Sequence, residues 1–442
     1  MASDLRSSKA GAQQGQALVL GMLLAGVAIV VFVRYFALGQ VVAAKARQLH
    51  ALDATAYSGA LIQARALNML AYINRAQIGH QVAMAHLVTL GSWASLGGTE
   101  ARQLASGNPP AYLIGMMFGA QHGAAYLAAR KAAGFDFLAT AQGDLGQAYA
   151  AHDATVRNVL NTVQDGVATG LPQVRWAAMQ AVLARNYPGV SSPTVFDLVL
   201  DHDSWPGYVQ AYSGRQLRPF LQGIAQLYGF LSPRNHTVSN PWSVDARCPA
   251  LRHQLRRRGT TELEESGLWR SLDTQSYHAL RSNKFIGCYY REYAMGWGWI
   301  PSASSQAMSE PHVETPPDDF SGQDFWRWVK EATDWDIAAG SDNPLANSKA
   351  AVGRQRWQGG GLPAYFDIAS HRRDTTLYFS LTLRRPGPQG LTINTHSAAE
   401  TFFDRPQARP DGRFEDSNLF YPYWQARLAA HGGSGTDTRG QP

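Results

Sequence analysis

The residues that could carry out chemistry in this chain form a few small groups without the spacing of a known catalytic motif. Ser276 and His278 could act as nucleophile and base, but no Gly-x-Ser-x-Gly turn surrounds the serine. Glu262, Glu264 and Glu265 could supply paired carboxylates for glycoside cleavage, although sequence spacing cannot establish the facing geometry that this reaction needs. A charged helix start is the simpler interpretation of the three glutamates.

Metal ligands are also sparse. The thirteen histidines are scattered, and neither a His-Glu-x-x-His nor a Cys-x-x-Cys pattern occurs. Asp201, His202 and Asp203 form the densest cluster, but adjacent residues seldom point at one ion, so a polar turn before Trp205 is favoured. The sequence therefore predicts no catalytic residue, no metal site and no cofactor.

Aromatic side chains leave one binding alternative open. Tryptophans in the C-terminal half could form a platform for sugars, although aromatic residues at such spacing are more often part of a core. The five that suggest this are Trp297, Trp299, Trp326, Trp328 and Trp335.

The charge is basic but thinly spread. The net charge is +6 over 442 residues, and the densest basic run, Arg256 to Arg258, is followed at once by the three glutamates. We interpret this stretch as a solvated surface that neutralises itself. No zinc-finger, basic-zipper or RNA-recognition signature is present, so nucleic acid is not an expected partner.

The chain has two cysteines, Cys248 and Cys288. Outside the cytoplasm they could form one disulfide, which would stabilise the fold by roughly 3–4 kcal/mol in the chain-entropy model. Two unrelated buried thiols are the alternative.

The elements that would have to position these residues begin with an apolar segment. Residues 17–33 contain no charged, amide or hydroxyl side chain, and the segment extends to Leu38 if Arg34 snorkels to the headgroups. A cleaved secretory signal is the main alternative, because Arg6 and Lys9 precede the segment and small residues end it. The apolar core is long for such a signal, so a retained transmembrane helix is favoured. Counting positive charges on its two sides does not settle the orientation.

A helical stem is expected beyond the membrane. Apolar or small residues recur at helical spacing from Leu38 to Ala71, and the first proline is Pro109. Loops are predicted near Gly97-Gly98 and at 106–110, followed by helical sequence at 111–185 without a second membrane span. The small alanine faces would suit either an internal helix hairpin or packing against partner subunits.

The composition changes near Pro188, where prolines and tryptophans become frequent. Strand patterns are found at 363–369, 375–384 and 398–403, which indicates a small antiparallel sheet. The expected domains are a cytoplasmic tail at 1–16, the transmembrane helix at 17–38, a helical stem or domain at 39–190, an α+β domain at 191–431, and a disordered tail at 432–442.

The N-terminal part resembles the TadG-like proteins of the Tad (Flp) pilus-assembly system. A short polar tail ending in Gly-Gln, an apolar span and an Asp-Ala-x-Ala-x-x-x-Gly-Ala helix are typical of that family; the matching stretches are 14–20, 43–49 and 53–60. The resemblance covers about residues 10–65. It implies a single-pass protein of the bacterial inner membrane with a large periplasmic part and a role in assembling or anchoring a thin pilus.

Two departures from related proteins limit what the resemblance implies. The Asp-x-Ser-x-Ser metal motif of many family members is absent, so metal-dependent adhesion is not implied. Cutting after Gly15, as in prepilins, would put Leu20 where processed pilins have a glutamate, so no such processing is predicted.

Together these observations predict an α+β protein with a single N-terminal transmembrane helix, a helical stem and a C-terminal domain. The predicted function is non-enzymatic, as a structural component of a pilus-assembly or secretion apparatus. Its expected partners are the lipid bilayer and other pilus-assembly or pilin-like membrane proteins, with a possible homo-oligomer through the stem. The alternative is a membrane-anchored periplasmic enzyme or glycan-binding protein.

Overall fold

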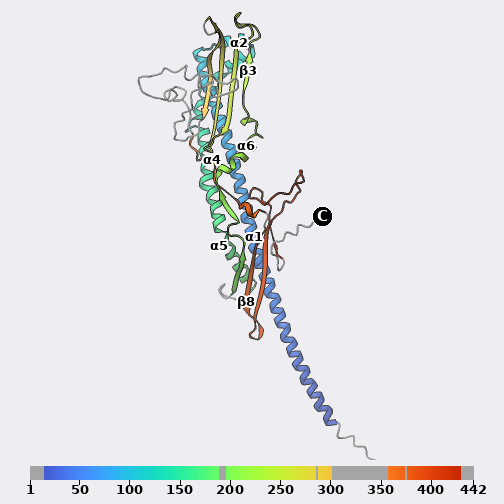
Figure 1. Cartoon of the computed structure of the whole chain (residues 1–442). Coiled ribbons are helices and arrows are strands. Elements are labelled where there is room, and N and C mark those ends of the chain that lie inside the picture. The colour runs from blue at the N-terminus through green and yellow to red at the C-terminus, as the bar shows by residue number, and fades with distance from the viewer. Residues whose placement is uncertain (1–13, 189–195, 285–286, 301–356, 374–375, 430–442) are drawn as a thin grey trace, which may run out of the picture. The chain divides into compact units, whose positions relative to one another are not determined.

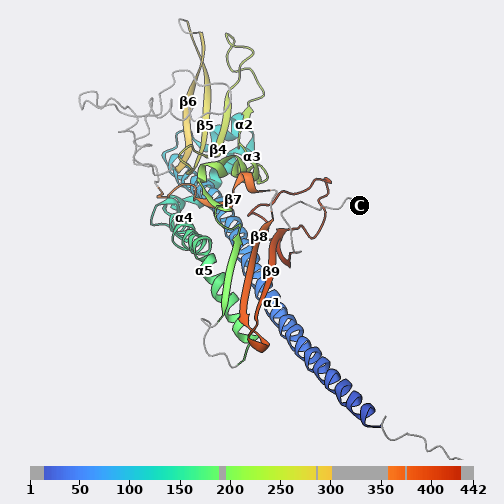
Figure 2. The same cartoon turned by 60° about the horizontal axis from the view of Figure 1, so that its bottom comes forward.

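The computed structural model combines helices with antiparallel sheets and packs as two compact units (Figures 1 and 2). It describes residues 14–188, 196–284, 287–300, 357–373 and 376–429. Unit 1 contains residues 1–71, 166–210 and 367–442, and unit 2 contains residues 72–165 and 211–366. The chain is therefore α+β, with a long apolar helix at its N-terminus and antiparallel sheets toward its C-terminus.

One helix, α1 (Gln14–Ser106), is 93 residues long and runs from the apolar segment through the stem. The predicted loop at Gly97-Gly98 is wrong, because the helix continues through both glycines. A Cβ on Gly97 would lie 2.8 Å from Ala132 Cβ, and one on Gly98 would lie 2.6 Å from Asp136 Oδ1. These glycines allow close packing in unit 2 and do not end the helix. The helix ends at Ser106, where a loop was predicted.

Unit 1 is built around a four-stranded antiparallel sheet in the order β1-β8-β9-β10. The strands are β1 (Asp197–Asp203), β8 (Leu377–Pro386), β9 (Thr392–Phe403) and β10 (Trp424–Leu428), and α5 (Asn161–Arg185) is the second long helix. The core joins Leu52, Ala56 and Ala60 of α1 to Met179 of α5 and Phe379 of β8. The predicted strands at 375–384 and 398–403 correspond to β8 and β9.

Unit 2 has a second antiparallel sheet, in the order β3-β4-β5-β6. Its strands are β3 (His236–Ser239), β4 (Gln254–Leu263), β5 (Trp269–Asn283) and β6 (Gly287–Ile300). The sequence analysis did not predict this sheet.

Short helices fill the connections. They are α2 (Ala111–Phe118), α3 (Ala120–Ala128), η1 (Ala129–Ala132), η2 (Phe135–Ala139), α4 (Asp144–Ala154), the π-helical η3 (Thr155–Leu160), η5 (Gly214–Leu217), α6 (Arg218–Ala225), η6 (Gly229–Leu231), η8 (Ser370–Arg372) and η9 (Pro388–Gly390). A separate two-stranded sheet pairs β2 (Val209–Tyr212) with β7 (Tyr365–Ile368), where a strand was predicted at 363–369.

The two units do not follow the linear order of the predicted domains. Both the helical stretch before residue 190 and the stretch after it contribute to each unit. A change in composition reports only on neighbouring residues, whereas packing joins segments that are distant in the sequence. The change in proline and tryptophan content near Pro188 therefore does not coincide with the division into two units. The tails predicted at the two ends lie almost entirely outside the described residues.

Candidate membrane anchor and buried polar clusters

The first part of α1 has no cover from the rest of the described chain. Its large apolar side chains from Leu18 to Leu38 are all more than half exposed, and Gln48 is the first buried side chain of the helix. Among the described residues, α1 is the one helix long and apolar enough to cross a membrane. Burying such a surface in lipid is strongly favourable, which makes this segment the candidate anchor.

The alanine face of the stem is occupied within unit 1. Ala51, Ala56, Ala60 and Ala64 are at most 2% exposed. A Cβ on Gly59 would meet the Met179 sulfur at 2.7 Å, so α5 approaches α1 closely. The small side chains of this stretch therefore pack inside their own chain.

A buried carboxylate, Asp273 of β5, lies at the centre of a polar cluster in unit 2. It is 0% exposed and pairs with Arg234 (Nη2 to Oδ2, 2.8 Å) and Arg257 (Nη2 to Oδ1, 3.1 Å). Ser92 of α1 donates to its Oδ2 at 2.5 Å. Two oppositely charged partners and a hydroxyl donor satisfy the carboxylate, which explains how a charge is retained in the core.

Hydroxyl groups extend this cluster between helix and sheet. Thr89 of α1 lies 2.8 Å from the Thr261 hydroxyl of β4, which lies 2.8 Å from Ser271 of β5. Ser271 in turn lies 2.8 Å from the Ser92 hydroxyl. We call these four hydroxyl residues, with Asp273, Arg234 and Arg257, the Asp273 cluster. Its groups bond to one another, which indicates that it fastens α1 to the sheet.

Glu100 of α1 is a partly buried acid near the same arginine. Burial raises its pKa to about 7, and the charge of Arg257 opposes this shift. Burial also lowers the pKa of Arg257, against the opposing effects of Asp273 and Glu100. The pKa of Glu100 therefore lies near neutral pH.

The arginine run at 256–258 is not the solvated surface that we predicted. The three residues lie within β4, where Arg258 is 7% exposed and donates to His236 O at 2.9 Å and to Thr237 Oγ1 at 2.7 Å. Arg257 pairs with Asp273. These contacts offset part of the cost of burying the guanidinium groups.

The structure brings Ser276 and His278 together. The serine hydroxyl lies 2.9 Å from His278 Nε2, because residues two apart on β5 share one face. His278 is 1% exposed and Ser276 is 6% exposed. A nucleophile must reach its substrate, so this buried pair acts as a contact within the sheet.

Asp201, His202 and Asp203 lie on β1, not in the predicted polar turn. Asp201 accepts a hydrogen bond from Thr382. Asp203 pairs with Arg175, which is 2% exposed and also donates to Gln63 Oε1 at 2.9 Å. The two carboxylates are thus used in separate contacts of unit 1, and no group of three metal-ligating side chains converges anywhere in the described ranges.

The predicted helix start at the three glutamates is also wrong. Glu262 is the next-to-last residue of β4, and it pairs with Arg270 of β5 at 2.9 Å, while Glu264 contacts the same arginine at 3.4 Å. The glutamates therefore belong to the hairpin that joins β4 to β5. The prediction failed because the hydrophobic pattern does not distinguish a helix from a hairpin in such a short charged run. Trp297 and Trp299 lie on β6, with Trp299 6% exposed, whereas Trp326, Trp328 and Trp335 lie outside the described residues.

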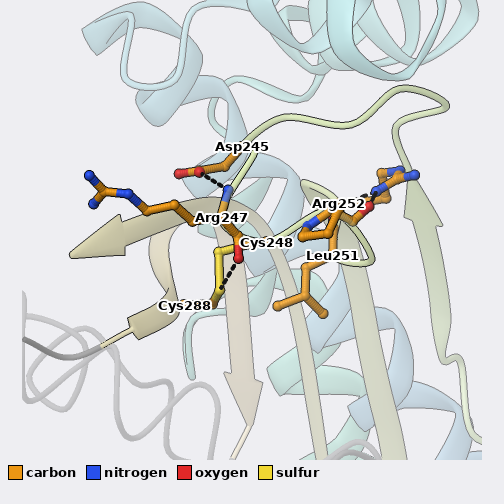
Figure 3. Close-up of a disulfide and its surroundings, with 7 residues drawn as sticks. Asp245, Arg247, Cys248, Leu251, Arg252 and Cys288 are labelled. Atoms are coloured by element: carbon orange, nitrogen blue, oxygen red, sulfur yellow. Dashed lines mark hydrogen bonds between the residues drawn. A yellow bond between two sulfur atoms is a disulfide. The ribbon is translucent and has the colours of Figure 1, made fainter. Parts of the chain in front are cut away.

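Cys248 and Cys288 are joined by a disulfide in unit 2 (Figure 3). It ties the loop before β4 to the start of β6, and Asp245 accepts a hydrogen bond from the Arg247 N–H beside it at 2.8 Å. Such a bond persists in oxidising compartments.

Sequence reasoning missed the Asp273 cluster and the buried glutamines of α1. Gln48 and Gln63 are at most 3% exposed, and the helical pattern of apolar residues did not predict their burial. A comparison with known protein families, with characterised proteins and with solved structures finds no match for this chain.

Proposed function

We propose that this protein is a non-enzymatic, membrane-anchored component of the bacterial cell envelope. The observation that carries the proposal is α1, which exposes apolar side chains from Leu18 to Leu38 and then continues unbroken into the core of unit 1. A helix of a soluble core would be buried, so the bilayer is the natural cover for this segment.

The continuity of α1 favours a retained anchor over a cleaved signal. Cleavage near Ala37 to Gly39 would require an extended substrate at a point where the helix has neither a break nor a proline. The disulfide supports an extracytoplasmic place for unit 2, because cytoplasmic thiols are kept reduced. The inner membrane and the periplasm are therefore the compartments that we propose.

Assembly of a Tad-type pilus is the role that fits this anchor and the TadG-like N-terminus. In that role the helix would hold the two units at the periplasmic face, where they would meet other pilus-assembly proteins. Two of the polar groups that the sequence offered for chemistry, Asp203 and Ser276, are engaged in contacts within the fold, which favours a non-enzymatic role.

A topology and deletion experiment tests the proposal. A C-terminal tag on the full-length chain should remain in the membrane fraction, resist protease in intact cells and be degraded in spheroplasts. Removing the protein should then impair pilus assembly or secretion, and crosslinking should capture pilus components. Protection in spheroplasts that is lost only with detergent would place the units in the cytoplasm and contradict the proposal. Intact assembly after removal would contradict the pilus role alone.

A further inference from the structure

We propose that the turn between β8 and β9 is a second membrane contact, which rests on the phospholipid headgroups beside the point where α1 leaves the bilayer. The proposal rests on the membrane anchoring proposed above. It concerns the turn Pro386 to Leu391, which lies with α1 in unit 1.

Four hydrogen bonds, donated by three side chains, set the register of the hairpin against the helix. The Thr401 hydroxyl donates to Ala60 O at 3.1 Å, and the Ser397 hydroxyl donates to Asp53 Oδ1 at 2.6 Å. The Gln48 amide donates to Leu383 O at 2.8 Å and to Ile393 O at 3.1 Å. As β9 is followed back toward the turn, its contacts therefore move along α1 toward the membrane segment, as Figures 1 and 2 also show.

This register gives the level of the turn along α1. From Thr401 to Ile393 the contacts advance from Ala60 to Gln48, which is about 18 Å of helix and so about 2 Å for each strand residue. The turn lies three or four residues beyond Ile393, so it reaches the level of about residues 42 and 43. This level is about 7 Å beyond Leu38, within the headgroup layer if the hydrocarbon core ends there.

The side chains at this end of unit 1 suit a bilayer surface. Leu391 is 51% exposed at the turn, and Arg384 is exposed on β8. Lys45 and Arg47 are exposed on the adjoining part of α1. One exposed acid, Asp197, lies opposite Arg384 in the β1–β8 pair, so cations still outnumber acids here. Basic groups near the surface are attracted to anionic lipid.

A second contact would restrict the tilt of α1. A single helix can lean in the bilayer, whereas a helix with a hairpin resting on the same surface has two points of support. Leu391 would enter the interface, and the cations would lie among the phosphates. The orientation of unit 1 above the membrane would then be defined.

Lipid-quenching of a single label tests this contact. The native cysteines are bonded to each other, so Leu391→Cys supplies one free thiol in the full-length chain. The variant would carry an environment-sensitive fluorophore in vesicles of phosphatidylethanolamine and phosphatidylglycerol containing a lipid spin-labelled near its headgroup. The matched control is Gln425→Cys, at an exposed position on β10. The neighbouring Trp424 donates its backbone N–H to Asn68 Oδ1. Asn68 lies about 45 Å along α1 from Leu38, so the control position is far from the membrane segment.

The expected result is quenching at position 391 several times stronger than at position 425. A third variant, Phe32→Cys, reports the anchor itself through a lipid spin-labelled deep in its acyl chain. Quenching at position 32 with equal quenching at positions 391 and 425 would overturn the hairpin contact and leave the anchor standing. Loss of quenching at position 32 would overturn both proposals.

Discussion

Asp273 pairs with two guanidinium groups within unit 2, so its substitution should affect stability more than that of an exposed carboxylate. Asp273→Asn keeps the shape of the side chain but leaves Arg234 and Arg257 without their common counter-ion. We expect the free energy of unfolding to fall by about 3–5 kcal/mol, because uncompensated buried charge is costly. Urea denaturation followed by circular dichroism would measure this.

Glu262→Gln is the control for that substitution, because it also removes a carboxylate paired with arginine, but one that is 48% exposed. Its effect should be below about 1 kcal/mol. Equal losses for the two variants would mean that burial of Asp273 does not determine its contribution.

Glu100 should make stability depend on pH. In the unfolded chain its pKa is near the ordinary 4.5, whereas in the fold burial raises the pKa to about 7. The folded state therefore binds more protons between these values, and the free energy of unfolding should decrease as pH rises from about 4.5 to about 7. The decrease should be on the order of 3 kcal/mol.

Thermal melts at constant ionic strength, with the wild type and Glu100→Gln compared at each pH, would isolate this contribution. The variant cannot ionise, so the difference between the two proteins should change across the same pH range and level off above it. A difference that is independent of pH would show that the carboxyl group is ionised throughout.

At the scale of elements, the contact between α1 and β6 depends on glycines at alternate positions of the strand. A Cβ on Gly298 would lie 1.9 Å from Ser92 O, and one on Gly296 would lie 2.9 Å from Glu100 Cβ. Gly298→Ala should therefore lower the free energy of unfolding by about 1–3 kcal/mol or more, since backbone must move to admit the methyl group.

Gly79→Ala is the control, because that helical glycine has nothing within 4 Å, and alanine there should raise stability by up to about 1 kcal/mol. Chemical denaturation would compare them; a stabilising Gly298→Ala would contradict the close approach.

The elements differ in how far the sequence predicts them. The long helix was predictable because small and apolar residues repeat with the helical period from Leu38 to Ala71. Strand β6 was not, since glycine positions carry no hydrophobic signal where the helix lies closest. On β5 the expected alternation is altered, because Ser271 and Asp273 are the buried contacts to α1. The candidate anchor was predictable from composition, whereas the Asp273 cluster depends on pairings between distant segments.

For the whole molecule, the disulfide is the covalent link between the loop before β4 and the strand β6. It joins residues 40 apart in sequence, so replacing both cysteines by serine should lower the free energy of unfolding by about 4 kcal/mol in the chain-entropy model. Denaturation of the double variant beside the oxidised wild type would test this. A comparable loss in wild type treated with a reductant would assign the effect to the bond; a loss only in the double variant would assign it to the substitutions.

The division of α1 into an anchor and a core element makes a prediction about truncation. A chain that begins at Val41 lacks the apolar segment but keeps every buried side chain of the helix, because the first of these is Gln48. We expect it to remain soluble without detergent, with the disulfide formed and a melting curve like that of the full-length protein. A chain that begins at Ala66 also loses Leu52, Ala56 and Ala60 from the core of unit 1. Loss of those contacts should exceed the 5–15 kcal/mol that stabilises a typical domain, so unit 1 should not fold.

Circular dichroism and size-exclusion chromatography would separate these outcomes. If the Val41 chain aggregates as the Ala66 chain does, the apolar segment contributes to folding itself, and its exposed side chains are covered by protein and not by lipid. If the Val41 chain folds and the Ala66 chain does not, α1 changes role between Leu38 and Gln48. The same helix then serves as membrane anchor in its first part and as a core element of unit 1 in the part that follows.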